Sequence, residues 1–323
     1  MALRRLRSGT RKLAAALAVL TLTVTACGGD GNSASSKGGR QRITVAALPL
    51  TDDAALYLAQ DRGLFRKEGL DVRIQPVQQS IQALPALNKG QVDVIASANY
   101  VTFLQAYDKG TLDLRILAEG ARAAPHMMDV LVPKDSAIKS VSDLKGRKVA
   151  VQILNNIQSL TLDTILDARG AGRPVYRQIL FPQMGPALEK GEVDAVHVVE
   201  PFDSALQRDL GARVLLDGAS SPVQSLPLSG YVTTRRFAAG NPKAAAAFQR
   251  AVAAAAVIAT RSPDAVRKLL PTYTKVTADQ AVSIHLPAYP ATTDAGQLRR
   301  VIRLMREQGL LTKDIDPGAL VVK

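Results

Sequence analysis

The strongest constraint on the fold is a twelve-residue stretch that occurs twice in the chain. Residues 82–93 read QALPALNKGQVD and residues 183–194 read QMGPALEKGEVD, with eight identical positions. Each copy predicts a short helix ending at a glycine, Gly90 or Gly191, since glycine readily adopts the left-handed conformation past a helix end. A buried strand is expected next, at 92–96 and at 193–199. The alternative is a chance similarity of composition, which the fixed spacing of the matches disfavours.

Both predicted repeat strands stop in polar residues. The first ends in Ser97-Ala98-Asn99 and the second in Glu200-Pro201. In open α/β sheets, ligands bind outside the carboxyl ends of the strands. The repeat therefore predicts two similar α/β lobes, each presenting a strand end to a shared cleft.

The remaining chain alternates strand and helix patterns, which indicates largely parallel sheets. Further strands are predicted at 43–48, 70–76, 112–117, 148–152, 175–180, 213–216 and 230–234. Helices are predicted at 54–62, 100–108, 141–145, 157–169, 202–209, 243–260, 263–270, 278–286 and 295–308, with Asn241 capping the long helix before Pro242 at its first position. Residues 129–133 are a candidate crossing into the second lobe and 230–234 the return. Two crossings make a hinge, and ligand binding at a hinge normally works by closure.

The N-terminal segment has the features of a secretion signal. Five basic residues precede an apolar run of twelve residues at 13–24, too short for the ~20 residues of a membrane span. The run ends in Val24-Thr25-Ala26-Cys27, which is similar to a bacterial lipobox. In that resemblance, residues 1–26 are removed and Cys27 carries the lipid. The alternative is an ordinary signal peptide with a chance cysteine.

Composition excludes several classes of function. Cys27 is the single cysteine, so its acylation leaves no thiol for disulfides, metal binding or catalysis. The chain holds no G-x-S-x-G, H-E-x-x-H or Walker motif, and Gly170-Ala171-Gly172 fits a helix terminator better than a dinucleotide fingerprint. The formal charge of +13 falls to +8 without residues 1–26, but the basic residues are scattered and aromatic residues are few. We therefore predict no catalysis, no cofactor, no metal and no nucleic-acid partner.

Several ordered stretches resemble a known family. They are ITVAALP at 43–49, AQDRGLFRKEGLDV at 59–72, LNKGQVD at 87–93, DLKGRKVAV at 143–151, EPF at 200–202 and GYVTTRRF at 230–237. Together they resemble the substrate-binding proteins of nitrate, sulfonate, taurine and bicarbonate ABC importers, a family that also includes binders of thiamine-precursor pyrimidines. The resemblance implies a type II periplasmic-binding-protein fold, an α/β fold of two Rossmann-like lobes joined by a two-stranded hinge.

The resemblance also implies a domain division and a set of partners. We expect a signal peptide at 1–26, a flexible Gly- and Ser-rich tether at 27–42, lobe I at 43–128 plus 230–323, and lobe II at 129–229. The partners would be a small-molecule ligand and an ABC permease. The protein would be a monomer, held by its lipid anchor on the extracytoplasmic face of the cell membrane.

In this resemblance the ligand lies between the lobes, ringed by strand ends. From the first lobe the candidate ligand-binding residues are Leu50, Thr51, Asp52, Gln79, Ser80, Ser97, Asn99 and Tyr100. Ser80 at a helix start suits an anionic group, although glutamines precede it where the family often has glycine. Asp52 and Asp53 alternatively cap the helix that begins at Ala54.

From the crossing and the second lobe, the candidates are His126, Gln152, Asn155, Asn156, Glu200 and Tyr231. The amide side chains can donate or accept hydrogen bonds. Glu200 favours ligand donors such as amines or ring N–H groups, or else it caps or ion-pairs at the helix that follows. His197 is predicted to be a satisfied core residue, and His285 a structural residue late in a helix.

Two choices stay open at the level of sequence. A sulfonate or other small oxyanion is the favoured ligand, with a pyrimidine or other nitrogenous ring as the alternative. The rival functions are an extracytoplasmic enzyme on the same fold and a sensing subunit that signals without transport.

Overall fold

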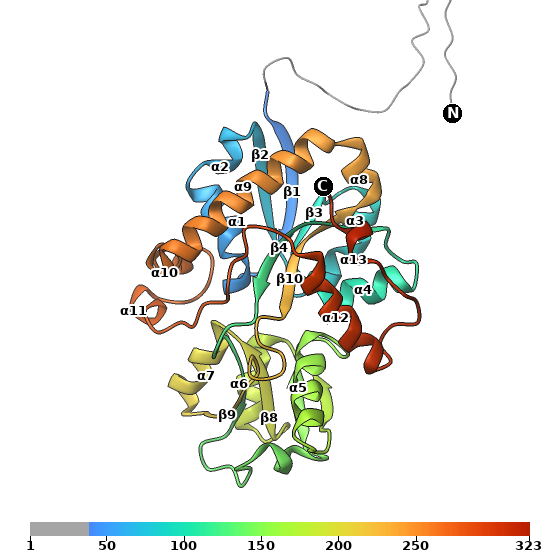
Figure 1. The fold of residues 1–323 in the computed structure, drawn as a ribbon. Helices are drawn as coiled ribbons and strands as arrows, with labels where there is room; N and C mark the ends of the chain where they lie inside the picture. The colour runs from blue at the N-terminus through green and yellow to red at the C-terminus, as the bar shows by residue number, and fades with distance from the viewer. Residues whose placement is uncertain (1–38) are drawn as a thin grey trace, which may run out of the picture. The chain divides into compact units, whose positions relative to one another are not determined.

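The computed structural model describes residues 39–323, whose ten strands form two five-stranded sheets (Figure 1). Sheet A has the order β2-β1-β3-β10-β4 and sheet B the order β7-β6-β8-β5-β9. The strands of sheet A are β1 (Gln41–Ala47), β2 (Leu70–Pro76), β3 (Val94–Asn99), β4 (Leu114–Arg122) and β10 (Pro227–Thr234). Those of sheet B are β5 (Met128–Val132), β6 (Lys148–Val151), β7 (Val175–Gln178), β8 (Ala195–Val199) and β9 (Arg213–Asp217). The predicted signal peptide, Cys27 and most of the tether lie outside the described residues.

The helices connect the strands and cover the sheets. The α-helices are α1 (Ala54–Asp61), α2 (Leu64–Lys67), α3 (Leu84–Lys89), α4 (Tyr100–Asp108), α5 (Ile157–Ala168), α6 (Phe181–Glu189), α7 (Phe202–Leu210), α8 (Arg235–Gly240), α9 (Pro242–Arg261), α10 (Pro263–Leu269), α11 (Ala278–Ala281), α12 (Ala295–Glu307) and α13 (Pro317–Leu320). Short 3-10 turns are η1 (Thr51–Asp53), η2 (Ser80–Ala83), η3 (Val141–Leu144) and η4 (Leu270–Thr272). Within residues 39–323, no helix combines the length and the apolar character that a membrane crossing requires.

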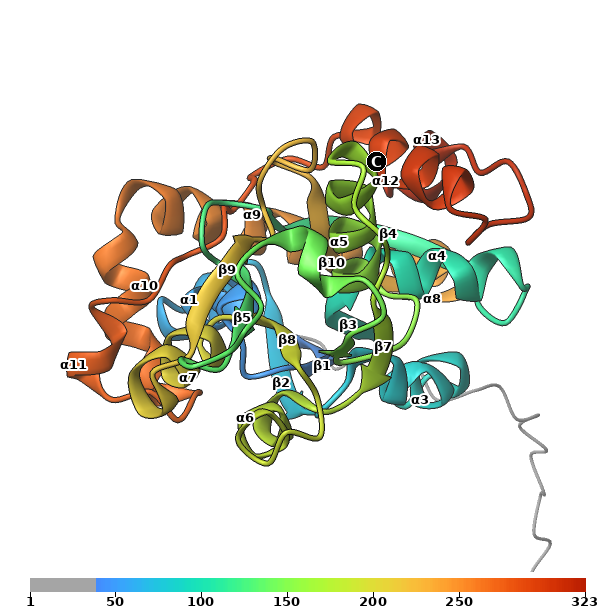
Figure 2. The same cartoon turned by 90° about the horizontal axis from the view of Figure 1, so that it is seen from below.

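Sheet A is buried on both faces. Side chains alternate along a strand, and on β1 Ile43, Val45 and Ala47 pack with α1 and α9 on one face. Ala46 belongs to the core on the other face, which also includes residues of α3, α4 and α12. Sheet B is covered by α5 on one side and by α6 and α7 on the other (Figures 1 and 2).

The repeat has the same structure in both copies. Gly90 and Gly191 follow α3 and α6 with φ of 73° and 69°, as predicted. The repeat strands begin two residues later than predicted, at Val94 and Ala195. The intervening aspartate explains this delay, because each binds the neighbouring parallel strand: Asp93 Oδ2 accepts from Thr44 N and Asp194 Oδ2 from Lys148 N, both at 2.8 Å. A chance similarity of composition does not produce this matched pair of contacts.

The sheets are mixed and not wholly parallel. β10 runs antiparallel to β3 and β4, and β5 runs antiparallel to β8 and β9, whereas the other pairs are parallel. Both antiparallel strands are the first that the chain enters after crossing between sheets, so they run against the strands built by helix crossovers.

The crossings themselves correct one prediction. The chain leaves sheet A after β4 and enters sheet B at Met128, so residues 123–127 form the first crossing and 218–226 the second. Residues 129–133, predicted as the crossing, lie almost wholly in β5 inside sheet B. The return at 230–234 is confirmed within β10. The exact division into lobe I and lobe II at 128/129 and 229/230 stays a prediction.

Two local predictions are wrong. The helix predicted at 278–286 is only one turn, α11, and the chain after it is irregular. Asn241 stands before α9 but does not cap it, because its side chain donates to Phe237 O and accepts from Gln41 Nε2. The pattern of the sequence located these elements but not the tertiary contacts that shape their ends.

Candidate functional site

A small cavity lies where strand ends of the two sheets meet. Its volume is about 40 Å³, far below the roughly 300–1,000 Å³ of typical ligand pockets and enough for only a few waters. The lining residues are Leu48, Leu50, Asp52, Ser80, Ser97, Asn99, Met127, Met128, Gln152, Ile157, Gln158, Phe181, Val199, Leu228 and Ser229. Six of the fourteen predicted ligand-binding residues are among them: Leu50, Asp52, Ser80, Ser97, Asn99 and Gln152.

Sheet A supplies most of the polar lining. Leu50 and Asp52 follow β1, Ser80 begins η2, and Ser97 lies near the end of β3. Ser97 has a φ of 44°, and its buried hydroxyl faces the Asp53 carboxyl group, whose pKa it lowers, without making a well-formed hydrogen bond to any described residue. An unpaired buried hydroxyl is costly, so a ligand atom that pairs with it would gain that energy back.

Asp52 is the charged group of this cavity. Ser229 Oγ donates to Asp52 Oδ2 at 2.8 Å, whereas Asp52 Oδ1 is buried without a partner in the described part of the chain. Burial raises the pKa of Asp52 above its usual value, and the Ser229 bond opposes this only in part. No Arg or Lys is among the lining residues. The site therefore suits a ligand that brings a hydrogen-bond donor or a positive charge to Asp52.

Asp53 lies behind the cavity. Its Oδ2 accepts from Leu48 N at 3.1 Å, so it holds the backbone at the end of β1. Its side chain makes no cap bond to α1, and neither does that of Asp52, so the capping alternative is wrong for both. Burial raises the pKa of Asp53 to about 8, with Asp52 adding to the rise.

Sheet B supplies amide and apolar groups. Gln152 follows β6, and Gln158 lies in the first turn of α5. Gln158 accepts from Gln152 N and from Asn156 Nδ2, each at 2.9 Å, and donates to His197 O. Its amide is thus already paired and shapes the wall. Met127 and Met128 come from the first crossing and the start of β5.

Hydrogen bonds bridge the cavity rim from one sheet to the other. Gln79 Nε2 donates to Gln152 O at 2.8 Å, and Gln152 Nε2 donates to Gln78 O at 2.9 Å. Beside them, Asn99 Oδ1 accepts from Ile157 N at 3.3 Å, and Gln105 Nε2 donates to Asn155 O at 3.0 Å. These bonds and the small volume describe a closed cleft.

Three predicted residues contribute to this closure without lining the cavity. Gln79 forms the bridge just described, and Asn155 offers its backbone carbonyl. Thr51 is buried and donates from its hydroxyl to Glu200 O at 3.3 Å.

The other predicted residues serve local structure in this state. Asn156 caps α5 through bonds from Gln158 N and Ser159 N. The rings of Tyr100 and Tyr231 are fully buried, and Tyr231 packs edge-on against Phe248 of α9. His126 lies outside the cavity and bonds Asp129. Sequence could not decide these outcomes, because they depend on which way each side chain points.

Glu200 follows its capping and ion-pairing alternative. It is buried, and it accepts from Ser204 Oγ at 2.6 Å and from Ser204 N in the first turn of α7. Burial raises its pKa, while its bonds to Ser204 and His285 oppose the rise. His285 N donates to Glu200 Oε1 at 3.0 Å. His285 therefore lies in an irregular segment and contacts Glu200, instead of lying late in a helix.

His197 is a core residue, but its side chain is not satisfied. It is fully buried in β8, and neither ring nitrogen has a partner among residues 39–323. Burial lowers its pKa to about 4, so the ring is neutral.

Sequence reasoning missed most of the apolar lining and Ser229. Phe181 follows directly after the predicted strand at 175–180, so the strand-end rule points to it. Ser229 lies just before the predicted strand at 230–234, because the predicted start is three residues later than the observed start of β10 at Pro227. No local signal marked Met127 and Met128 as lining residues.

Comparison with known proteins gives one family match and several relatives. The family model described as NMT1/THI5 like matches residues 51–266. A putative thiamine biosynthesis protein of Haemophilus influenzae is 31% identical over 45% of this chain and 45% of its own length. A putative aliphatic sulfonates-binding protein of Escherichia coli is 30% identical over 58% of this chain and 57% of its own. The chain thus spans about half the length of these curated relatives.

Solved structures share the fold. The alkanesulfonate-binding protein SsuA from Xanthomonas axonopodis pv. citri, bound to MOPS, matches with a TM-score of 0.75 and 22% identity, over 88% of this chain and 99% of its own. A desulfurization enzyme, DSZB, matches with a TM-score of 0.65 and 16% identity, over 88% and 96%. At these identities the likeness concerns the fold alone, and it includes both a binding protein and an enzyme. The predicted periplasmic-binding-protein fold is confirmed.

Proposed function

The chain belongs to the NMT1/THI5-like family, and on that premise we propose that it is the extracytoplasmic solute-binding component of an ABC importer. It captures a small molecule between its two sheets and delivers it to a membrane permease. The observation that supports this most is the closed cavity, whose walls come from both sheets and whose rim is held by the Gln79 and Gln152 bridges. A site built from two bodies joined by two chain crossings suits capture by closure.

The favoured ligand is a small sulfonate that also carries an amine, as taurine does. The hydroxyls of Ser80 and Ser97 offer donors to sulfonate oxygens, and the free Asp52 Oδ1 offers an acceptor to an ammonium group. A sulfonate without an amine would meet a carboxyl group and no basic side chain among the lining residues. The names of the sulfonate-binding relatives support this chemical class.

A nitrogenous ring is the second candidate, because the same Asp52 can accept from a ring N–H or an exocyclic amine. The relative named for thiamine biosynthesis supports it. The small number of aromatic side chains disfavours this candidate. Flat rings usually stack on aromatic side chains, and Phe181 is the only aromatic residue of the described cavity lining.

Thermal unfolding against a solute panel tests both candidates. The panel contains taurine, ethanesulfonate, nitrate, bicarbonate, an aminopyrimidine and riboflavin. A ligand at 100 times its dissociation constant stabilises the folded state by about 2.7 kcal/mol. A shift with taurine that Asp52→Asn abolishes supports the amine-bearing sulfonate, and a shift confined to the aminopyrimidine supports the ring. Equal shifts with ethanesulfonate and taurine, both unchanged in Asp52→Asn, would contradict the role given to Asp52.

The remaining parts of the proposal concern location, assembly and the rival functions. Cys27 carries a lipid that anchors the protein on the extracytoplasmic face, and the protein works as a monomer with no catalytic residues. An extracytoplasmic enzyme on the same fold is the alternative of another class. Chemical conversion of a bound panel solute during prolonged incubation would establish the enzyme and overturn the receptor.

A further inference from the structure

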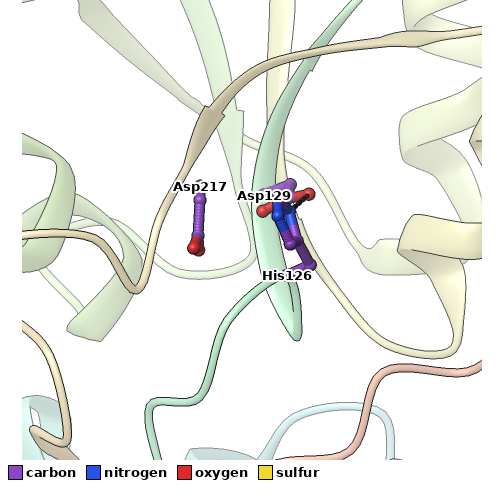
Figure 3. Close-up of side chains that lie close together, drawn as sticks. All are labelled: His126, Asp129 and Asp217. Atoms are coloured by element: carbon purple, nitrogen blue, oxygen red, sulfur yellow. Dashed lines mark hydrogen bonds and ion pairs between the residues drawn. The ribbon is translucent and has the colours of Figure 1, made fainter.

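Three potential metal ligands lie together at the chain crossings (Figure 3). His126, Asp129 and Asp217 each offer one ligand atom, and these atoms lie within 4.8 Å of one another. His126 belongs to the first crossing, Asp129 to β5, and Asp217 ends β9 directly before the second crossing. Because Asp129 and Asp217 lie 88 positions apart in the sequence, no sequence spacing predicts this cluster.

The two carboxylates are unfavourably placed without a cation. Asp129 and Asp217 are direct register partners in the β5–β9 pair, and like charges opposite one another destabilise a sheet. A third carboxylate is close, since Asp203 Oδ2 accepts from Asp129 N at 2.8 Å. Within residues 39–323, neither Asp129 nor Asp217 has an ion pair with Lys or Arg.

An unpaired atom points independently to a missing partner. Asp129 is fully buried, and its Oδ2 lies 3.1 Å from His126 Nδ1. Its Oδ1 has no hydrogen-bond partner in the described part of the chain. Figure 3 shows this carboxyl group beside the His126 ring, with one oxygen on the side of Asp217. A buried carboxylate oxygen in that position lacks the partner that a cation would provide.

We propose that His126, Asp129 and Asp217 bind a divalent cation of the zinc class at the hinge. One imidazole and two carboxylates form a donor set that suits Zn²⁺, whereas Ca²⁺ prefers six to eight oxygens. Bond lengths of about 2.0–2.2 Å bring tetrahedral ligand atoms to about 3.4 Å from one another. The cluster must therefore contract, and exposed His126 and half-buried Asp217 are the members with room to move.

Water or His285 would occupy the fourth ligand position. The His285 ring centroid lies 5.6 Å from that of His126, and His285 comes from the segment that follows α11. A bound metal would link His126, in the first crossing, to Asp217, directly before the second crossing. This link would stiffen the hinge. The three side chains would bind the metal whether or not the protein serves transport, and whatever the solute.

Zinc titration calorimetry on the purified, tag-free and EDTA-treated protein tests the site. We expect one Zn²⁺ per chain with micromolar or tighter affinity, and a loss of at least 100-fold in His126→Ala and in Asp217→Asn. Asp217→Asn keeps an oxygen that can accept from Ala219 N, as Asp217 Oδ1 does at 2.8 Å. Asp209→Ala, which removes an exposed carboxylate of α7, is the matched control and retains binding.

The visible absorption of bound Co²⁺ reports metal coordination directly, so it would not change if the three residues had only a structural role. Co²⁺ added to the metal-free protein should develop the visible absorption of a low-coordinate site, and Asp217→Asn should lose it. Metal-free melting curves establish that each variant is folded. The proposed site would be overturned if the unaltered protein showed no stoichiometric Zn²⁺ binding. It would also be overturned if His126→Ala and Asp217→Asn bound Zn²⁺ as strongly as the unaltered protein, which would leave adventitious surface binding only.

Discussion

Removal of the Gln79 side chain should open the cleft. Gln79 Nε2 donates to Gln152 O across the buried cavity rim at 2.8 Å, and Gln79 does not line the cavity. A hydrogen bond of this kind contributes about 0.5–1.5 kcal/mol net, and the carbonyl left unpaired and buried costs about 1–3 kcal/mol. In the open state both groups are hydrated, so Gln79→Ala penalises the closed state alone.

The size of the effect follows from that difference. We expect the closed state to lose about 1–2 kcal/mol relative to the open state, which is about a 5- to 30-fold change in the equilibrium. A solute that binds only the closed form then binds more weakly by up to the same factor. The double variant Gln79→Ala/Gln152→Ala removes both bridges and should open the cleft further.

Two measurements check this prediction. Spin labels at the exposed repeat lysines Lys89 and Lys190, in a Cys27→Ser background, report the distance between the two bodies without any solute. Calorimetry with the solute found in the panel reports affinity. The matched control is Gln249→Ala, since Gln249 Nε2 donates to Leu117 O and Val322 O on the sheet A side alone. It should lower the melting temperature and leave both readouts unchanged.

If Gln79→Ala keeps the distance distribution of the unaltered protein and an affinity within about twofold, the bridge does not hold the cleft closed. Equal effects of Gln79→Ala and Gln249→Ala would point to general loss of stability instead of closure.

Three further predictions concern stability and location. The pKa of Asp53, raised to about 8 by burial, means that the folded state holds a proton that the unfolded state releases near pH 4. The contribution of Asp53 protonation to the free energy of unfolding is full below pH 4 and falls by up to about 1.4 kcal/mol per pH unit as the pH rises to 8. The stability of Asp53→Asn relative to the unaltered protein should therefore grow from pH 5 to 8. A difference in stability that is independent of pH would contradict this. Asp194→Ala should lower the free energy of unfolding by about 1–2 kcal/mol in urea, because it removes the hydrogen bond to Lys148 N. A change near zero would show that the repeat aspartate does not stabilise the strand pair. Cys27→Ser should move the protein from the membrane fraction to the soluble fraction of the producing cells, and unchanged fractionation would exclude the lipid anchor.

Local signals in the sequence predicted most of the helices and strands, the repeat and an α/β arrangement, whereas the type II periplasmic-binding-protein fold was implied by the resemblance to a known family. Apolar periodicity placed β2 and α4 at their observed bounds, and glycine marked the ends of the repeat helices. Local signals failed where a distant segment decides the conformation. The segment after α11 was expected to be helical, but His285 N bonds Glu200 instead.

Strand ends also located part of the candidate site. Leu50, Asp52, Ser80, Ser97, Asn99 and Gln152 line the cavity because the carboxyl ends of strands meet at one edge of each sheet. The direction in which each side chain points along those ends is a tertiary matter. Tyr231 and Ser229 are two residues apart on β10, yet Ser229 bonds Asp52 in the cavity whereas Tyr231 packs against Phe248.

The contacts at the two crossings depend on how distant parts of the chain pack together. Met127 and Met128 line the cavity because closure places the first crossing against it. Asp129 meets Asp217 because β5 enters sheet B antiparallel, between β8 and β9. Local physics fixes each element from a few neighbouring residues, whereas contacts between distant residues depend on how the finished sheets are joined.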